Sequence, residues 1–360
     1  MSLKKDFEKF TVDLNEELIT VLKKLNETGK KVLFVSENGK LIGTITDGDI
    51  RRYMLKIGKI EGFVRDFYNP DPVTINYRDI NKIDIRKIFN DAKVEIIPVI
   101  NGNRIIKGYL EWSDFVSDKD FEIVEKIEFD IPVIIMAGGK GTRLKPFTDV
   151  LPKPLIPLGD KTAMEKIIEN FKKFGLKNFY TIVNFKGNII EAYFNTIKKD
   201  YSLKFIWEEE FLGTVGGLKL IEKIIPDQDF FVSNCDIIVK ANLKEILDFH
   251  LNNKSIFTSI TSIHHHKIPY GVVEINRGGT IEKIVEKPEF VFQINTGVYL
   301  LNRRALKYIP EGQYFDMPQL IEKLIQNHEK VYAYPVKESD YIDIGQWSEY
   351  KKVLDFLHKL

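Results

Sequence analysis

A glycine-rich stretch followed by two cations is the part of this sequence best suited to chemistry. It reads AGGKGTR from Ala137 to Arg143, and Lys153 follows ten residues later in LPKPLIP. Closely spaced glycines let the backbone approach a ligand and leave amide groups free to donate to phosphate oxygens. An arginine holds such oxygens bidentately and a lysine adds a point charge. The spacing fits neither GxxxxGK[ST] nor GxGxxG, so the stretch predicts a phosphate loop of another kind.

Two aspartates complement these cations. Asp236 closes the apolar segment DFFVSNCD, and Asp343 lies in YIDIG near the C-terminus. Carboxylate oxygens are the ligands that Mg²⁺ prefers, and nucleotide phosphates commonly complete its shell. By residue type Asp236 and Asp343 are candidate ligands of Mg²⁺, and that they hold this cofactor together is what the family resemblance described below implies. A single aspartate at the end of a strand is, alternatively, a helix cap.

The elements that position these residues form an alternating α/β pattern. PVIIMA, from Pro132, is a continuous apolar run typical of a strand buried on both faces of a sheet. Strand-like and helix-like segments alternate after it, in the order AMEKIIENFKKFG, NFYTIVN, NIIEAYFNTIKK, LKFIWEE, GGLKLIEKII and DFFVSNCD. The pattern predicts a Rossmann-like, doubly wound mixed sheet, in which ligands bind at the carboxyl ends of the strands. The glycine-rich stretch falls at such an end.

The N-terminal third contains an internal repeat. FVSENGKLIGTITDGDI, from Phe34, is echoed by VINGNRIIKGYLEWSDF, from Val99, and each has two strands around a polar turn, then glycine and aspartate. TVDLNEEL and TINYRDI precede them as matching starts. The sequence therefore predicts a tandem pair of β-α-β-β-α modules at residues 1–120, a linker at 121–130 and an α/β domain at 131–360.

Composition excludes several classes of function. Lys+Arg 53 against Asp+Glu 52 gives a formal net charge of +1, which provides no field for nucleic acid or an anionic membrane. The single cysteine excludes an intrachain disulfide framework. The N-terminal MSLKKDFEKF lacks the apolar segment of a signal peptide, and no run is long enough to cross a bilayer. We expect a cytoplasmic protein with small-molecule partners.

The C-terminal part resembles the sugar-1-phosphate nucleotidyltransferases, also called NDP-sugar pyrophosphorylases. AGGKGTRLKPFT…LPKPLIPLG looks like their signature, and EEEFLGTVGGLKL, VSNCD, IPYGVVEI, VEKPE, INTGVYLLN and YIDIGQWSEYKK continue the match in order. The resemblance implies transfer of a nucleoside monophosphate from an NTP to a sugar 1-phosphate, with release of pyrophosphate. Such chemistry depends on charge neutralisation and in-line positioning.

The resemblance also assigns roles. Arg143 would hold the leaving phosphates, Lys153 the α-phosphate, and Lys287 the phosphate of the sugar, with Glu286 on a sugar hydroxyl. The catalytic set is Arg143, Lys153, Asp236 and Asp343. The substrate-binding set is Ala137, Gly138, Gly139, Gly141, Thr142, Gly213, Thr214, Gly271, Glu286, Lys287, Asn295 and Thr296.

The expected nucleobase and sugar depend on similarity to particular subgroups of the family. LGTVGG, from Leu212 to Gly217, looks closer to guanylyltransferases than to thymidylyl or uridylyl enzymes, which favours GTP. The whole layout resembles bacterial enzymes that make GDP-hexosamine precursors of sialic-acid-like surface sugars such as legionaminic acid. This makes glucosamine 1-phosphate a candidate acceptor.

The repeat resembles a pair of cystathionine-β-synthase (CBS) domains. In that family Gly-x-x-Thr-x-x-Asp binds the ribose and phosphate of an adenine nucleotide, and it maps here to Gly43, Thr46 and Asp49 as an effector site. Glu111 replaces the threonine in the second copy and places a negative charge where phosphate would bind, so we expect one site. The alternative is that the pair only dimerises or supports the other half. CBS pairs commonly dimerise, so a homo-oligomer is expected.

Two other functions stay open. The first alternative is a nucleotide-sensing scaffold whose transferase domain is inert. The second is a transferase specific for UTP, CTP or dTTP. The charged residues needed for catalysis are all present, which argues against the scaffold. The YGVVE and EKP segments argue against cytidylyl transfer to a phosphorylated alcohol.

Overall fold

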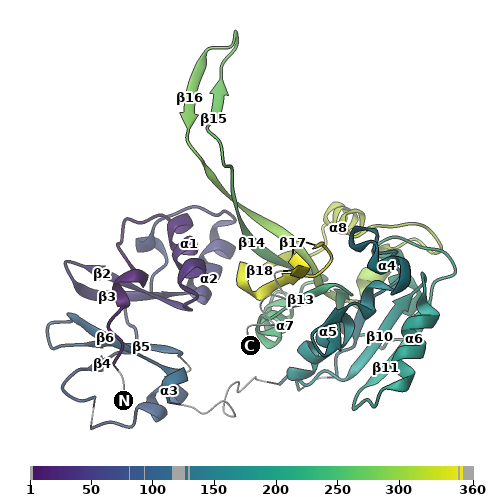
Figure 1. Cartoon of the computed structure of the whole chain (residues 1–360), viewed down its shortest axis with the longest axis horizontal. Helices are drawn as coiled ribbons and strands as arrows, with labels where there is room; N and C mark the ends of the chain where they lie inside the picture. The colour runs from purple at the N-terminus through teal and green to yellow at the C-terminus, as the bar shows by residue number, and fades with distance from the viewer. Residues whose placement is uncertain are drawn as a thin grey trace. The chain divides into compact units, whose positions relative to one another are not determined.

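The computed structural model describes residues 3–80, 82–92, 94–115, 126–128, 130–347 and 349–351 (Figure 1). The chain divides into two compact units. The first comprises Met1–Ile123 and Ile263–Phe292, and the second comprises Val124–Ser262 and Gln293–Leu360. Most of the linker expected at 121–130 lies outside the described residues. The segment 263–292, expected within the α/β domain, belongs to the first unit.

The two modules of the first unit have the same strand order. In each three-stranded sheet the middle strand pairs in parallel with the first strand and antiparallel with the third. The elements of the first module are β1 (Thr11–Val12), α1 (Leu18–Thr28), β2 (Val32–Glu37), β3 (Lys40–Thr46) and α2 (Asp47–Ile57). Those of the second module are β4 (Ile75–Asn76), α3 (Ile85–Ala92), β5 (Ile96–Ile100) and β6 (Ile106–Glu111). Gly43 pairs with Val35, and Gly108 pairs with Val99, so the predicted repeat is present in the structure. The two glycines are 65 residues apart but their partners are 64 apart, so the second hairpin contains one extra residue and the two copies do not align at a single offset.

Local sequence explains the helices of the first module. Leu18, Val21, Leu22 and Leu25 recur at helical spacing on α1 and are buried. The helix ends at Gly29, whose φ of 62° suits a residue without a side chain. The helix α2 starts at a capping box made by Thr46 and Asp49. Single-turn 3-10 helices at Phe7–Phe10, Val64–Asp66 and Trp112–Asp114 complete the unit.

A β-ribbon connects the two units along the chain. The strands β14 (Phe257–Lys267) and β17 (Glu289–Asn302) are neighbours in one sheet, and the antiparallel pair β15 (Val272–Ile275) and β16 (Ile281–Val285) lies between them in sequence. Figure 1 shows these two long strands leading into the β15–β16 hairpin. The chain leaves the second unit within β14 and returns within β17.

The second unit is built on a seven-stranded mixed sheet with the order β11-β10-β7-β12-β17-β14-β18. The first four of these strands run parallel, β17 pairs antiparallel with β12, and β18 pairs in parallel with β14. The strands not yet given are β7 (Val133–Met136), β10 (Asn178–Val183), β11 (Ser202–Trp207), β12 (Asp229–Asn234) and β18 (Val331–Val336). This confirms the predicted doubly wound α/β class.

Both faces of the sheet are covered. Val133 and Ile135 point into one core with α5 (Ala163–Lys173), α6 (Gly187–Thr196) and α7 (Leu243–Asn252). Ile134 points into the other, with α8 (Met317–Gln326) and 3-10 helices at Gly216–Ile221 and Arg303–Tyr308. This alternation explains the continuous apolar run of the strand. GGLKLIEKII, expected to be a helix, forms only the first of these 3-10 turns.

Short elements complete the second unit. They are β8 (Pro157–Leu158), β9 (Lys161–Thr162), β13 (Ile237–Val239), β19 (Tyr341–Asp343), α4 (Phe147–Val150) and 3-10 turns at Thr142–Leu144, Lys153–Leu155 and Glu338–Asp340. Within the described part of the chain, every helix is too short or too polar to span a bilayer.

Candidate active site

A two-stranded sheet brings the two predicted metal ligands together. Ile237 of β13 pairs with Asp343 of β19, so Asp236, one residue earlier, lies beside Asp343. The backbone amide of Ile344 also donates to the carbonyl of Asp236 at 3.0 Å. Residues more than a hundred positions apart are thereby fixed by backbone pairing.

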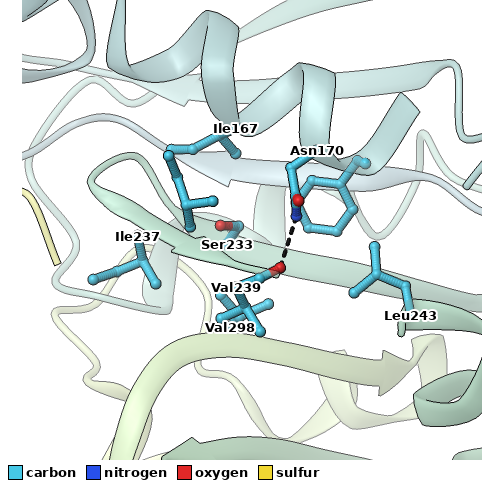
Figure 2. A pocket seen from close by; sticks show the side chains of 9 residues that line it. Ile167, Asn170, Ser233, Ile237, Val239, Leu243 and Val298 are labelled. Atoms are coloured by element: carbon cyan, nitrogen blue, oxygen red, sulfur yellow. Dashed lines mark hydrogen bonds between the residues drawn. The ribbon is translucent and has the colours of Figure 1, made fainter. Parts of the chain in front are cut away.

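Packing beneath β13 holds this small sheet in place. Asn170 of α5 donates through Nδ2 to the carbonyl of Val239 at 2.8 Å, as Figure 2 shows. Ile167 and Leu243 lie in the same apolar layer. A buried amide that satisfies a strand carbonyl fixes the height of the strand over the helix.

Lys153 lies between the acidic side chains. Its ammonium forms an ion pair with Asp236, and both side chains are almost buried, at 13% and 7% exposure. A Cβ built on Gly345 would lie against the same Asp236 carboxylate, 2.9 Å from Asp343 Oδ1 and 3.0 Å from Lys153 Nζ. Three functional groups therefore surround one glycine, where a side chain would displace them.

The electrostatics of this cluster favour an added cation. Burial raises the pKa of Asp343, the neighbouring Asp236 raises it further, and the Gly345 amide, Lys153 and Arg143 act in the opposite sense. The Gly345 amide donates to Asp343 Oδ1 at 2.6 Å. Across the described residues, no group of three or more His, Cys, Asp or Glu side chains is placed to hold a metal. The oxygen pair of Asp236 and Asp343 fits Mg²⁺ whose remaining ligands come from phosphate and water.

The glycine-rich stretch follows β7, as expected. Ala137 is buried, and its amide donates to the carbonyl of Ile182 at 2.8 Å. Gly141 has a φ of 64°, and a Cβ there would lie 2.9 Å from Thr148 and 3.1 Å from Lys153. Thr148 donates to the Gly141 carbonyl at 2.9 Å. Gly139, by contrast, has open space around its Cα.

A cleft of about 280 Å³ collects much of the predicted site. It is lined by Arg143, Thr214, Asn234, Asp236, Ile237, Asn295, Thr296, Gly297, Tyr299, Met317, Pro318, Tyr341 and Asp343. Thr142 precedes Arg143 in the 3-10 turn at Thr142–Leu144. The second unit alone thus places most of the catalytic set around one cavity.

The loop containing Gly213 and Thr214 is anchored by an acid that sequence analysis missed. The amide and the hydroxyl of Thr214 both donate to Asp316 Oδ1 at 2.9 Å. A Cβ on Gly213 would lie 2.7 Å from the carbonyl of Phe315. Thr214 thus has a structural role in holding the loop to the start of α8.

On β17, the two predicted sugar ligands differ in their hydrogen bonds and in their access to the cleft. Thr296 donates its hydroxyl to the carbonyl of Ile260 at 2.7 Å and is buried. Asn295 accepts from Ser259 at 3.3 Å and donates to the Tyr299 hydroxyl at 2.7 Å, while it lines the cleft. Gly297 lies so close to Asn234 that a Cβ would overlap the amide. Asn234 and Gly297 were not expected from the sequence.

The three remaining residues that the resemblance assigns to the sugar phosphate lie in the first unit, on the β15–β16 hairpin. Gly271 precedes β15, and a Cβ there would lie 2.9 Å from Glu286 Oε2. Glu286 and Lys287 follow β16, are 72% and 57% exposed, and approach one another only to 3.9 Å. The Lys287 amide donates to the carbonyl of Tyr270 at 3.2 Å, and its φ is 48°. The hairpin therefore fixes the backbone of the lysine but leaves its ammonium in solvent.

The predicted effector residues are paired with one another. The backbone amide and hydroxyl of Thr46 donate to Asp49 Oδ2 at 2.8 and 2.6 Å. Gly43 lies against Tyr68 and the Asn69 carbonyl, so any side chain there would clash. In the second module Glu111 binds Lys4 at 2.6 Å and Lys30 at 2.9 Å.

A buried acid, Glu208, is a further residue that sequence analysis missed. It follows β11, is 4% exposed, and burial raises the pKa of its carboxyl to about 7. A Cβ on Gly138 would lie 2.7 Å from Glu208 Oε2, and one on Gly217 would overlap Oε1. Oε1 is one of the few buried polar atoms of the described side chains without a hydrogen-bond partner. The only sequence signal was an acid at the carboxyl end of an apolar strand.

Known proteins resemble both units. The sequence profile of the nucleotidyl transferase family matches residues 132–359, and that of the CBS domain matches residues 5–56. A mannose-1-phosphate guanyltransferase of Candida albicans is 33% identical over 225 residues, 59% of this chain and 60% of the relative. A UTP–glucose-1-phosphate uridylyltransferase of Synechocystis is 30% identical over 236 residues, 60% of this chain and 61% of the relative. The chain thus spans about 60% of the length of the curated relatives it matches.

A solved structure has the same fold. HddC from Yersinia pseudotuberculosis, complexed with GMP-PN, aligns with a TM-score of 0.50 and 25% identity over 63% of this chain and 99% of that chain. The alignment covers nearly the whole of HddC, and the family profile covers well over half of this chain. The N-terminal unit contains a CBS domain, and the chain as a whole belongs to the nucleotidyl transferase family.

Proposed function

We propose that this protein transfers a nucleoside monophosphate, with GTP as the donor, to a sugar 1-phosphate. A phosphate oxygen of the sugar attacks the α-phosphorus of the NTP, the bond from that phosphorus to the bridging oxygen of the β-phosphate breaks, and pyrophosphate leaves. Atoms and charge balance without a covalent enzyme intermediate. The observation that carries the proposal is that Arg143, Asp236 and Asp343 line one cleft, with Lys153 paired to Asp236 beside it.

Each residue has a role that its surroundings support. Arg143 is exposed at the mouth of the cleft, where its guanidinium is free to hold the departing pyrophosphate oxygens. Lys153 is placed to move from Asp236 to the α-phosphate, whose charge grows during transfer. Asp236 and Asp343 would hold Mg²⁺, which neutralises charge on the triphosphate when it is bound. Glu286 and Lys287 would bind the sugar phosphate.

Glu208 supports guanine as the base. An ionised carboxylate accepts two hydrogen bonds from adjacent donors, and guanine offers such a pair in its N1–H and its 2-amino group. Uracil and thymine offer one N–H between two acceptors. The unpartnered Oε1 of Glu208, lying among the glycines at Gly138 and Gly217, has the acceptor that this pairing requires. The guanyltransferase relatives agree with this choice, whereas the uridylyltransferase relative keeps UTP as the alternative.

Two more specific proposals concern the identity of the acceptor sugar and of the effector. Glucosamine 1-phosphate is the proposed acceptor, and mannose 1-phosphate and glucose 1-phosphate are suggested by the names of the relatives. We propose an adenine nucleotide at Gly43, Thr46 and Asp49. Its test is direct binding of ATP, ADP and AMP to the intact chain and to a Thr46→Ala, Asp49→Ala double variant.

The decisive experiment is pyrophosphate release with Mg²⁺ across GTP, UTP, CTP, dTTP and ATP, each with the three sugar phosphates. We expect release that requires GTP and one sugar phosphate together. Release that requires UTP instead of GTP would show that the proposed donor is wrong and that Glu208 does not select guanine. Absence of release from every pair, with nucleotide still bound, would favour the inert scaffold.

A further inference from the structure

The hairpin that bears Glu286 and Lys287 is rooted in the first CBS module. Ile263 of β14 is only 6% exposed and belongs to the same apolar cluster as Val21 and Leu22 of α1. Val291 of β17 packs against that cluster from the other strand. Ile263 is therefore buried in this cluster, which also contains Ile96 and Ile106 of the second module, and the partly buried Val291 packs against it.

Charged contacts reinforce this root. Glu289, at the start of β17, lies 3.5 Å from Lys23 of α1 and 3.2 Å from His265 of β14. A pair of this kind at 25% and 47% exposure adds modestly to stability but restricts the direction of the strand. Packing and charge thus act at the same point of the ribbon.

The hairpin needs such support. A two-stranded sheet is marginally stable in water without a packed face. Beyond the root, Val273, Ile275, Ile281 and Ile284 are 45% to 65% exposed. Among the described residues of 263–292, Ile263 is the buried apolar side chain, and it lies at the root. The root therefore governs the position of the sugar-phosphate clamp, which we define as Gly271, Glu286 and Lys287 at the other end of the ribbon.

We infer that the first CBS module positions the sugar-phosphate clamp, and so sets the affinity for the sugar 1-phosphate separately from the affinity for the NTP. The inference rests on the proposed function. The proposed NTP residues, among them Gly138, Lys153 and Glu208, lie on segments of the second unit, whereas Gly271, Glu286 and Lys287 share the unit of the module.

One strand links the root to the cleft along the chain. Val291 packs on the module, and Asn295, four residues later on β17, lines the cleft in the second unit. The chain thus passes from the first unit to the second within β17.

The test uses the full chain and three variants. The root variant is Ile263→Ala with Val291→Ala, and a second, milder root variant is Glu289→Gln, which removes a charge without opening a cavity. The matched control is Ile275→Ala with Ile281→Ala, which shortens exposed residues on the same hairpin. Thermal unfolding of each variant confirms folding before kinetics.

The readouts are the KM for each substrate, from pyrophosphate release, and hydrogen exchange of the amides in 263–267 and 289–293. We expect the root variants to raise the KM for the sugar 1-phosphate by on the order of fivefold or more, with the KM for GTP unchanged within about twofold. Exchange at the root should quicken, and the control should match the wild type.

Equal KM values in an active wild type and its root variants would overturn the inference while leaving the function intact. A parallel rise in both KM values would also overturn it, since the module would then act on the whole site. If the wild type releases no pyrophosphate, the proposed function fails, and the root is judged by exchange alone. Identical exchange at 289–293 in wild type and root variants would then overturn it.

Discussion

The two ends of the proposed reaction are built in opposite ways. At the triphosphate end the side chains of Lys153 and Asp236 are almost buried, Asp343 is partly buried, and all three surround Gly345 closely. At the sugar-phosphate end Glu286 and Lys287 are mostly exposed and only 3.9 Å apart. Fixed, desolvated groups are the ones that stabilise charge without reorganising. The charged groups of the first end are thus preorganised for chemistry. At the second end the hairpin places the backbone, and the exposed side chains of Glu286 and Lys287 are ordered by the substrate.

Asp236→Asn should have the largest effect of the substitutions considered. It removes a charge from the preorganised end, so we expect kcat to fall by on the order of 10²-fold or more. The fold should persist, because β13 is held by its pairing with β19 and by Asn170. Pyrophosphate release and circular dichroism measure both. Asp248→Asn, on the exposed side of α7, is the control, and a wild-type kcat for Asp236→Asn would remove the metal assignment.

The next largest effect should come from Gly345→Ala. The added Cβ meets Asp236, Asp343 and Lys153 together, so we expect kcat to fall about 30-fold through misplacement alone. Gly102→Ala, where nothing lies within 4 Å, is the matched control. Unchanged kinetics for Gly345→Ala would show that these groups are not as tightly arranged as their contacts indicate.

Lys287→Ala examines the exposed end. Since its ammonium has only weak contacts in the folded chain, we expect stability to stay the same while the KM for the sugar phosphate rises about tenfold. Lys283→Ala on the same hairpin is the comparison. A loss of kcat with unchanged KM would place Lys287 in the preorganised group and weaken the contrast.

The smallest effect expected is a pH dependence of GTP binding. The pKa of Glu208 is raised to about 7 by burial, so the carboxyl gains a proton as the pH falls through that value and loses an acceptor for guanine. We expect the KM for GTP to rise on the order of fivefold between about pH 8 and pH 6. Glu208→Gln should raise the KM and remove its pH dependence in this range.

Glu208→Gln should weaken GTP binding but stabilise the folded protein at high pH. A carboxyl whose pKa is raised on folding loses stability as the pH rises from its unfolded value, 4.5, to its folded value of about 7. Glu208→Gln is neutral throughout, so its Tm should exceed that of the wild type by a few degrees at about pH 8 and not at about pH 4. A lower Tm at both pH values would mean that the carboxyl is already satisfied.

The backbone architecture could be predicted because it depends on short-range patterns. Continuous apolar runs such as PVIIMA indicate buried strands, and the 65-residue offset between Gly43 and Gly108 indicates the repeat. GGLKLIEKII has helical spacing, yet it forms only a 3-10 turn at Gly216–Ile221. Two of its glycines pack where a side chain would clash, and tertiary packing overrides local propensity there.

Residues of the site were predictable only where their type was informative. Arg143, Lys153, Asp236 and Asp343 carry charges in a recognisable order; Arg143, Asp236 and Asp343 line one cleft, and Lys153 forms an ion pair with Asp236. Gly345 is important to the site because charged atoms of three side chains surround it. Glu208 is important because two glycines pack against its carboxylate. Both facts arise from pairing between distant segments. A single sequence contains no measure of such proximity.

The ribbon also has a consequence for how this chain can be divided. Because 263–292 belongs to the first unit, the two units are interleaved in sequence, and no single cut separates them. A fragment beginning at residue 131 would keep Ile263 and Val291 but lose the apolar partners that α1 provides. The fragment would expose apolar side chains on a ribbon that lacks its packing partners, and we expect it to aggregate.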